Sequence, residues 1–137
     1  MTIRHPRLAS AALLGALALA VSGPAAAMSE AGMMAMTKAG QVMFEHRCRS
    51  CHADDPAARS YGPPLVGVIG RKAGSIEGFA YSDAMKASGL VWTEDALRAW
   101  MANNDGFMPG TRMRHVGVTD HTEQDFILAY LRTLTAK

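Results

Sequence analysis

The feature that most constrains this chain is a five-residue run that contains both of its cysteines, Cys48-Arg49-Ser50-Cys51-His52. Two residues between the cysteines place both sulfurs on one side of a single helical turn, and a histidine follows directly. This spacing is typical of covalent haem attachment, in which the thiols bond the porphyrin and the adjacent imidazole binds the iron. The run therefore predicts one haem c, attached through Cys48 and Cys51, with His52 as an axial ligand.

Other uses of a Cys-x-x-Cys spacing are less consistent with the rest of the chain. A zinc site needs two further ligands, and only scattered histidines are available for it, such as His46, His115 and His121. A redox-active dithiol needs a βαβ context, which the sequence lacks. A disulfide between residues this close together would brace very little of the chain.

The first 27 residues have the composition of a secretory signal peptide. Arg4 and Arg7 precede an almost unbroken apolar run from residue 8 to residue 21, and Ala25-Ala26-Ala27 gives a small-residue cleavage pattern. The apolar run is shorter than the about 20 residues that a membrane span needs. We therefore expect cleavage after Ala27, export to the bacterial periplasm and no stable membrane insertion of the mature protein. An uncleaved anchor is the alternative.

The charge balance gives no reason to expect a nucleic-acid partner. The chain has 14 basic and 12 acidic residues. Two of the basic residues, Arg4 and Arg7, fall in the predicted signal peptide, which contains no acid. The mature chain therefore carries equal numbers of each, and electrostatic docking must depend on how charge is distributed over its surface.

Hydrophobic periodicity predicts an all-α domain with three main helices, one or two short helices, long loops and no convincing strand. We expect a flexible N-terminus over 28–36 and a single domain over 37–137. Gly40 weakens a helix, so its presence in the first one suggests close approach of another helix. Thr93 is a good N-cap for the helix after it. The expected main helices cover 37–47, 94–102 and about 120–134, with a short one over 82–87 and a stop over 103–106.

A second iron ligand is needed if the haem is to carry electrons without binding a substrate. Met113 is our choice, because it ends a Met108-to-Met113 turn that can present a side chain to a flat cofactor. A thioether ligand stabilises ferrous iron. Met108, His115 or no sixth ligand at all remain alternatives from the residues alone.

From Gly40 to its end, the chain resembles the class I cytochromes c, close to the mitochondrial type and its bacterial periplasmic relatives. The resemblance covers nearly all of the mature chain and depends on several motifs in one order at nearly constant spacing. They are Gly40 and Phe44, the cysteine run, Gly62-Pro63-Pro64-Leu65, Gly67 with Gly70-Arg71-Lys72 and Gly74, the run from Gly78 to Ala84, Trp92-Thr93-Glu94-Asp95, Pro109-Gly110-Thr111-Arg112-Met113, and Ala129-Tyr130-Leu131.

The resemblance implies a fold and a set of site residues. The fold is a small monohaem cytochrome c wrapped round a covalently bound haem. His52 and Met113 would be the axial ligands, and the carbonyl of Pro63 would accept a hydrogen bond from His52. Gly40 and Phe44 would meet Ile127 and Tyr130 where the first and last helices cross. The groups that would enclose and hydrogen-bond the haem propionates are Arg71, Tyr81, Trp92 and Thr111.

Three positions depart from the family pattern. Trp100 replaces a tyrosine that usually approaches the methionine sulfur, His115 replaces an aromatic residue near the haem edge, and Met85 replaces an amide near a buried water. These changes should shift the redox potential and the strength of the iron–sulfur bond. His115 is also a substitute ligand for the case that Met113 leaves the iron, although a solvated histidine is the simpler interpretation.

The resulting hypothesis is a monomeric, soluble periplasmic one-electron carrier with no enzymatic activity. It would pass electrons from a quinol-oxidising complex or a dehydrogenase to a terminal oxidase, a peroxidase or a photosynthetic reaction centre. Arg47, Arg112 and Arg114 lie near the motif and the ligand loop and would dock acidic partners transiently. Two alternatives are an enzyme with a five-coordinate haem and a non-redox exported module with an ordinary disulfide.

Overall fold

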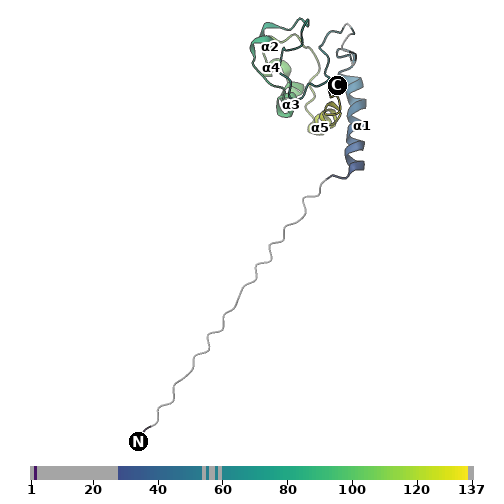
Figure 1. The fold of residues 1–137 in the computed structure, drawn as a ribbon, viewed down its shortest axis with the longest axis vertical. Coiled ribbons are helices and arrows are strands. Elements are labelled where there is room, and N and C mark those ends of the chain that lie inside the picture. Colours follow the sequence, from purple (N-terminus) through teal and green to yellow (C-terminus); the bar gives the residue numbers. More distant parts are fainter. Residues whose placement is uncertain (1, 3–27, 54, 56–57, 59, 136–137) are drawn as a thin grey trace.

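The structure is a computed structural model that describes residues 2, 28–53, 55, 58 and 60–135. Within these residues the elements are helical, joined by long loops, and the β-type pairing is an isolated bridge between Lys72 and Val91. The predicted all-α class is therefore confirmed (Figure 1). Apart from Thr2, the predicted signal peptide over 1–27 lies outside the described residues. The helices are α1 (Glu30–Arg47), α2 (Asp83–Ala87), α3 (Glu94–Ala102), α4 (Asn104–Phe107) and α5 (His121–Leu131).

Helix α1 begins at Glu30, which corrects the expected flexible N-terminus over 28–36. The side chain of Ser29 caps the helix by accepting a hydrogen bond from the Gly32 N–H at 3.1 Å, and Glu30 lies in the first turn, where a negative charge complements the helix dipole. Methionine and alanine then continue the helix because both have high helix propensity. Met33 and Met34 are exposed, so these first turns form without a buried face.

The crossing of α1 and α5 is the main helix–helix contact, and Figure 1 shows α5 beside α1. A Cβ atom added to Gly40 would lie 1.8 Å from the carbonyl oxygen of Phe126, so only glycine permits this approach. One turn later the ring of Phe44 packs against the ring of Tyr130, with the centroids 5.2 Å apart. Phe44 and Ile127 are both almost fully buried. The predicted close approach at Gly40 is confirmed.

Helix α3 begins where the sequence predicted, because the Thr93 hydroxyl accepts a hydrogen bond from the Ala96 N–H at 3.1 Å. Its inner face, made of Leu97, Trp100 and Met101, is buried. The ring of Trp100 meets the ring of Trp92 edge to face at a centroid distance of 5.1 Å. Both indole side chains belong to the buried core.

Asn103 ends α3 as predicted, but residues 104–107 form the short helix α4 instead of a plain stop. The Asn103 side chain accepts a hydrogen bond from the Gly106 N–H at 2.9 Å, so the residue that ends one helix caps the next. Helix α5 is shorter than predicted and ends at Leu131. Beyond it, the N–H of Leu134 bonds to the carbonyl of Leu131, a tighter i→i+3 pattern that is common at helix ends.

Charged side chains join the helices at three points. Arg47 at the end of α1 pairs with Glu123 at 2.8 Å, and Arg132 after α5 pairs with Glu94 at 2.6 Å. Arg98 of α3 pairs with Asp125 of α5. None of the helices among the described residues has the length and apolar character needed to cross a membrane.

Candidate functional site

The cysteine run follows directly after helix α1 and forms one further turn of the backbone. Cys48 is the C-cap of α1, and its carbonyl accepts hydrogen bonds from the N–H groups of Cys51 at 3.0 Å and His52 at 2.8 Å. Cys48 is half-buried and Cys51 exposed, and the two do not form a disulfide. In the chain without an attached group, burial raises the pKa of the Cys48 thiol to about 11.

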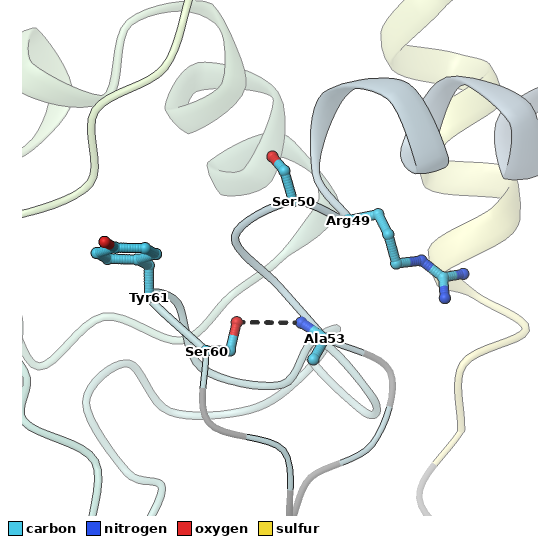
Figure 2. A pocket seen from close by; sticks show the side chains of 5 residues that line it. All are labelled: Arg49, Ser50, Ala53, Ser60 and Tyr61. Carbon is cyan, nitrogen blue, oxygen red and sulfur yellow. Dashed lines mark hydrogen bonds between the residues drawn. The ribbon is translucent and has the colours of Figure 1, made fainter.

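The chain folds back onto the run just after it. The carbonyl of Cys51 accepts hydrogen bonds from the Gly62 N–H at 2.7 Å and from the Ser60 hydroxyl, and that hydroxyl accepts one from the Ala53 N–H at 3.2 Å. Figure 2 shows the Ser60–Ala53 bond in an open depression, with the Arg49 side chain directed away from the ring of Tyr61. The depression is lined by Arg49, Ser50, Ala53, Ser60 and Tyr61.

His52 is buried, and its orientation is fixed by two neighbours. Its Nδ1 lies 2.7 Å from the carbonyl oxygen of Pro63, so Nδ1 carries the proton and donates it. A Cβ atom on Gly62 would lie 2.4 Å from Cε1 of the ring, so the imidazole occupies the place where any other side chain would project. Burial lowers the pKa of His52 and favours the neutral ring. A neutral imidazole that donates from Nδ1 keeps the Nε2 lone pair for a metal.

Three of the four residues that we expected around the propionates lie close together. The N–H of Trp92 bonds to the carbonyl of Arg71 at 2.9 Å, and burial raises the pKa of Tyr81 while the nearby Arg71 lowers it. The guanidinium of Arg71 donates to the carbonyls of Val66 at 2.8 Å and Pro64 at 2.9 Å. Arg71 thereby holds the segment that follows the acceptor of His52.

The fourth residue, Thr111, belongs to the loop of Met113. Thr111 is 3% exposed, and its hydroxyl accepts a hydrogen bond from the Met113 N–H at 3.4 Å. The loop reaches the Tyr81 segment through Arg112, which donates to the carbonyl of Ala80 at 3.0 Å. Arg71, Tyr81 and Trp92 are thus neighbours, and Thr111 is linked to them through the bond from Arg112 of its own loop to Ala80.

Two further side chains hold Met113, one from α3 and one from α4. The indole N–H of Trp100 donates to its sulfur at 3.1 Å, and the side-chain amide of Asn104 donates to its carbonyl at 2.7 Å. Sequence reasoning singled out Trp100 but missed Asn104. No sequence pattern marks an amide that binds a main-chain carbonyl nine positions later, so only the fold shows it.

His115 is half-buried and is therefore not the solvated side chain of the simpler interpretation. Its Nε2 lies 3.1 Å from the carbonyl oxygen of Met101, which assigns the ring proton to Nε2. Its Nδ1 is buried and has no hydrogen-bond partner among the described residues. Met85, the third departure from the family pattern, is buried in the core.

The cytochrome c family model matches residues 37–135 of this chain. The chain belongs to the cytochrome c family. It is 39% identical to cytochrome c2 of Blastochloris viridis over 126 residues, which cover 90% of this chain and 93% of that protein. It is 46% identical to cytochrome c-550 of Ancylobacter novellus over 94 residues, or 66% of this chain and 88% of the relative.

A solved structure extends the comparison to the fold. Cytochrome cH from Methylobacterium extorquens is 41% identical and superposes with a TM-score of 0.65. The match covers 71% of this chain and 97% of that structure. Membership of the cytochrome c family confirms the resemblance found in the sequence, and with it a haem c attached covalently through Cys48 and Cys51.

The residues of this cytochrome fit that cofactor. Two free thiols lie on the turn that directly precedes the imidazole, and the imidazole is oriented with its Nε2 lone pair available. Gly62 leaves space for the ring where any other residue would collide with it. Both cysteine side chains and the imidazole are therefore arranged by the backbone of the chain itself.

The three arginines expected to dock partners are exposed, but each already has a contact. Arg47 forms its ion pair with Glu123 on α5, and Arg112 donates to a main-chain carbonyl. Arg114 pairs with Asp105 at 3.1 Å and also donates to the carbonyls of Thr111 and Met113. Arg112 and Arg114 flank Met113, whereas Arg47 lies at the carboxyl end of α1.

Proposed function

We propose that this cytochrome is a soluble one-electron carrier of the bacterial periplasm, with His52 and Met113 as the axial ligands of its haem. The observation that carries the proposal is the fixation of the Met113 main chain on both sides of the residue: its carbonyl accepts a hydrogen bond from Asn104, and its N–H donates to Thr111. A core or surface methionine needs no such arrangement. A ligand does, because its sulfur must stay in one place.

Members of this family carry electrons, and two protein ligands suit that role better than catalysis. With a histidine and a methionine on the metal, no position is left for a substrate. The bound haem supplies an iron that gains and loses a single electron, with the thioether favouring the ferrous state. The protein's part is to hold the ligands in place in both oxidation states.

The chain holds His52 through consecutive contacts. Pro63 accepts the Nδ1 proton, and Arg71 ties the carbonyls of Pro64 and Val66 just after it. Such second contacts fix the tautomer and orientation of a ligating histidine. In this proposal the four connected residues Arg71, Tyr81, Trp92 and Thr111 also surround the propionates, whose burial is costly unless they are hydrogen-bonded.

Export is supported by the sequence and by one of the comparisons. The alignment with cytochrome c2 of Blastochloris viridis spans 126 residues, which is longer than the segment from Met28 to Lys137. It therefore reaches into the predicted signal peptide. Cleavage after Ala27 would leave a monomeric protein without membrane insertion.

The donor would be a quinol-oxidising complex or a periplasmic dehydrogenase, and the acceptor a terminal oxidase, a peroxidase or a photosynthetic reaction centre. Arg112 and Arg114 flank the ligand loop, and their exposed charge on an otherwise balanced chain favours acidic partners. Arg112 is the strongest of the three candidates, because Arg47 and Arg114 each already pair with a carboxylate, Glu123 and Asp105 respectively. Contacts of this kind are small and transient.

The ferric absorption spectrum of Met113→Ala tests the ligand assignment. We expect the sulfur-to-iron band at the red end of the spectrum to disappear while the haem stays covalently attached. Met108→Ala, which changes the buried methionine that precedes this loop, should retain the band. Loss of the band in Met108→Ala alone would refute the assignment, and high-spin ferric features in the wild type would refute the carrier.

A further inference from the structure

Asn104 contacts the main chain of Met113 and not its sulfur. It is the first residue of α4, it is 7% exposed, and its side-chain amide donates to the Met113 carbonyl at 2.7 Å. The same carbonyl accepts a second hydrogen bond from Arg114 at 3.1 Å. Arg114 in turn is held by Asp105, the residue next to Asn104. Two adjacent residues of α4 thus hold the backbone of Met113.

Helix α4 is built to keep Asn104 in place. Asn103 caps the helix through the Gly106 N–H, and a Cβ atom on Gly106 would lie 2.5 Å from the Asn103 amide nitrogen. The carbonyl of Asn104 accepts the Met108 N–H at 2.9 Å, which closes the single turn. The side chain of Asn104 therefore extends from a backbone that is held at both ends of the turn.

The contact with Trp100 cannot perform the same task. An N–H group directed at a thioether draws on the lone pairs that the sulfur would otherwise offer to iron, so it does not favour ligation. The Asn104 bond instead fixes the main chain of Met113 without engaging the sulfur. Leaving the iron requires Met113 to move, and movement of its backbone would leave a buried amide without its acceptor, which costs free energy.

We propose that Asn104 is a positioning residue that keeps the Met113 sulfur on the iron through its hydrogen bond to the Met113 carbonyl. The inference depends on the ligation of Met113 proposed above. Removal of the amide should raise the fraction of ferric protein in which the sulfur has left the iron. An external ligand binds only that fraction, so its apparent affinity reports the fraction directly.

The test is a titration of the ferric holoprotein with imidazole, followed by absorption. In Asn104→Ala we expect imidazole to bind about tenfold more tightly than in the wild type, which corresponds to about 1.4 kcal/mol. Ile127→Val, which weakens the core at the α1–α5 crossing, should leave the affinity within about twofold of wild type because it does not touch the loop. Equal tightening in both variants would mean general loosening and would overturn the proposal.

A matched pair of charge changes separates the hydrogen bond from electrostatics. Asn104→Asp replaces the donor by an acceptor beside a carbonyl, whereas Asn103→Asp makes the same change one residue earlier and keeps the α4 cap. We expect tighter imidazole binding in Asn104→Asp and nearly wild-type binding in Asn103→Asp. The same change in both variants would show that charge alone is responsible.

The wild type provides a measurement that needs no variant to fold. The side-chain amide protons of Asn104 should exchange slowly with solvent by NMR while Met113 is bound, and faster once imidazole has displaced it. Unchanged exchange would contradict the coupling. Loss of the red-end band in Met113→Ala together with wild-type imidazole affinity in Asn104→Ala would overturn this inference and leave the ligand assignment standing.

Discussion

The indole N–H of Trp100 donates to the sulfur of Met113 across 3.1 Å. The ring of Trp100 is buried and meets the rings of Trp92 and Phe107 edge to face, so its direction is set by packing. An indole has a donor and no acceptor, which fixes the direction of this hydrogen bond. The sulfur therefore shares its lone-pair density between the indole and any metal that it binds.

Trp100→Phe should lower the midpoint potential of the haem. Without the N–H donor, the thioether sulfur donates more electron density to the iron. This donation stabilises the ferric state more than the ferrous state. If the lost hydrogen bond favoured the ferrous over the ferric state by about 1 kcal/mol, its removal lowers the potential by about 40 mV for a one-electron couple. Redox titration measures it. Phe107→Leu, which changes the packing around Trp100 without removing a donor, should change the potential much less, and a raised potential in Trp100→Phe would contradict the prediction.

Gly40→Ala should destabilise the protein although alanine favours helices. The added Cβ atom would lie 1.8 Å from the carbonyl oxygen of Phe126, so α1 and α5 must separate. We expect a loss of about 2–3 kcal/mol in the free energy of unfolding, measured by urea denaturation.

Gly32→Ala is the control within the same helix. Its Cβ atom would meet only the Ser29 hydroxyl at 3.4 Å, and the change should stabilise the protein by about 0.5–1 kcal/mol. Equal effects at the two glycines would mean that the crossing is not as close as described.

Gly62→Ala should displace His52. Its Cβ atom would lie 2.4 Å from Cε1 and 2.5 Å from Nδ1 of the ring, so the bond from Nδ1 to Pro63 cannot persist. We expect the Nδ1 proton of the ferrous protein to lose its slow exchange by NMR, and the free energy of unfolding to fall by about 1–3 kcal/mol. Tyr61→Ala, at the adjacent and 92% exposed position, should change it by less than about 0.5 kcal/mol. Slow exchange that survives in Gly62→Ala would disprove the steric argument.

The ion pair between Glu94 and Arg132 should make a pH-dependent contribution to stability. The hydrogen bond from Arg132 lowers the pKa of Glu94 below its ordinary value of 4.5. The folded state therefore favours the carboxylate, and the stabilisation is present above pH 4.5 and lost as the pH falls through the lowered pKa. Because both side chains are at least one-third exposed, we expect no more than about 0.5–1 kcal/mol at pH 7.

Urea denaturation of the wild type and Glu94→Gln between pH 7 and pH 3 measures this contribution. The difference between the two proteins should shrink toward zero at the acidic end. A difference that stays constant over the range would show that Glu94 acts through packing and not through its charge.

The sequence predicted those parts of the fold that depend on local chemistry. Thr93 caps α3 and Gly40 marks a helix crossing, as expected. The Pro63 carbonyl accepts from His52, as the family resemblance implied. The start of α1 was missed because residues 30–36 bury nothing, so their helix leaves no hydrophobic period to detect. Asn104 was missed because its partner is a main-chain carbonyl, and any residue at position 113 would provide one.

The three arginines expected to dock partners show a further limit of prediction from the sequence. Their number and neighbourhood could be read from the chain, but their ion pairs could not. Arg47 meets Glu123 from the other end of the sequence, and Arg114 meets Asp105 only because α4 turns back toward the ligand loop. Pairings of this kind depend on the tertiary fold, so the charge that remains for a partner is smaller than a count of arginines suggests.

The contact between Phe44 and Tyr130 joins segments near the two ends of the cytochrome c domain. Closing a loop of this length costs conformational entropy, which the contacts at the crossing must offset. A nascent chain that ends before residue 130 cannot bury Phe44, whatever else it has formed. Phe44 lies one helical turn before Cys48, so the burial of the segment that leads into the cysteine turn depends on the last helix to be synthesised.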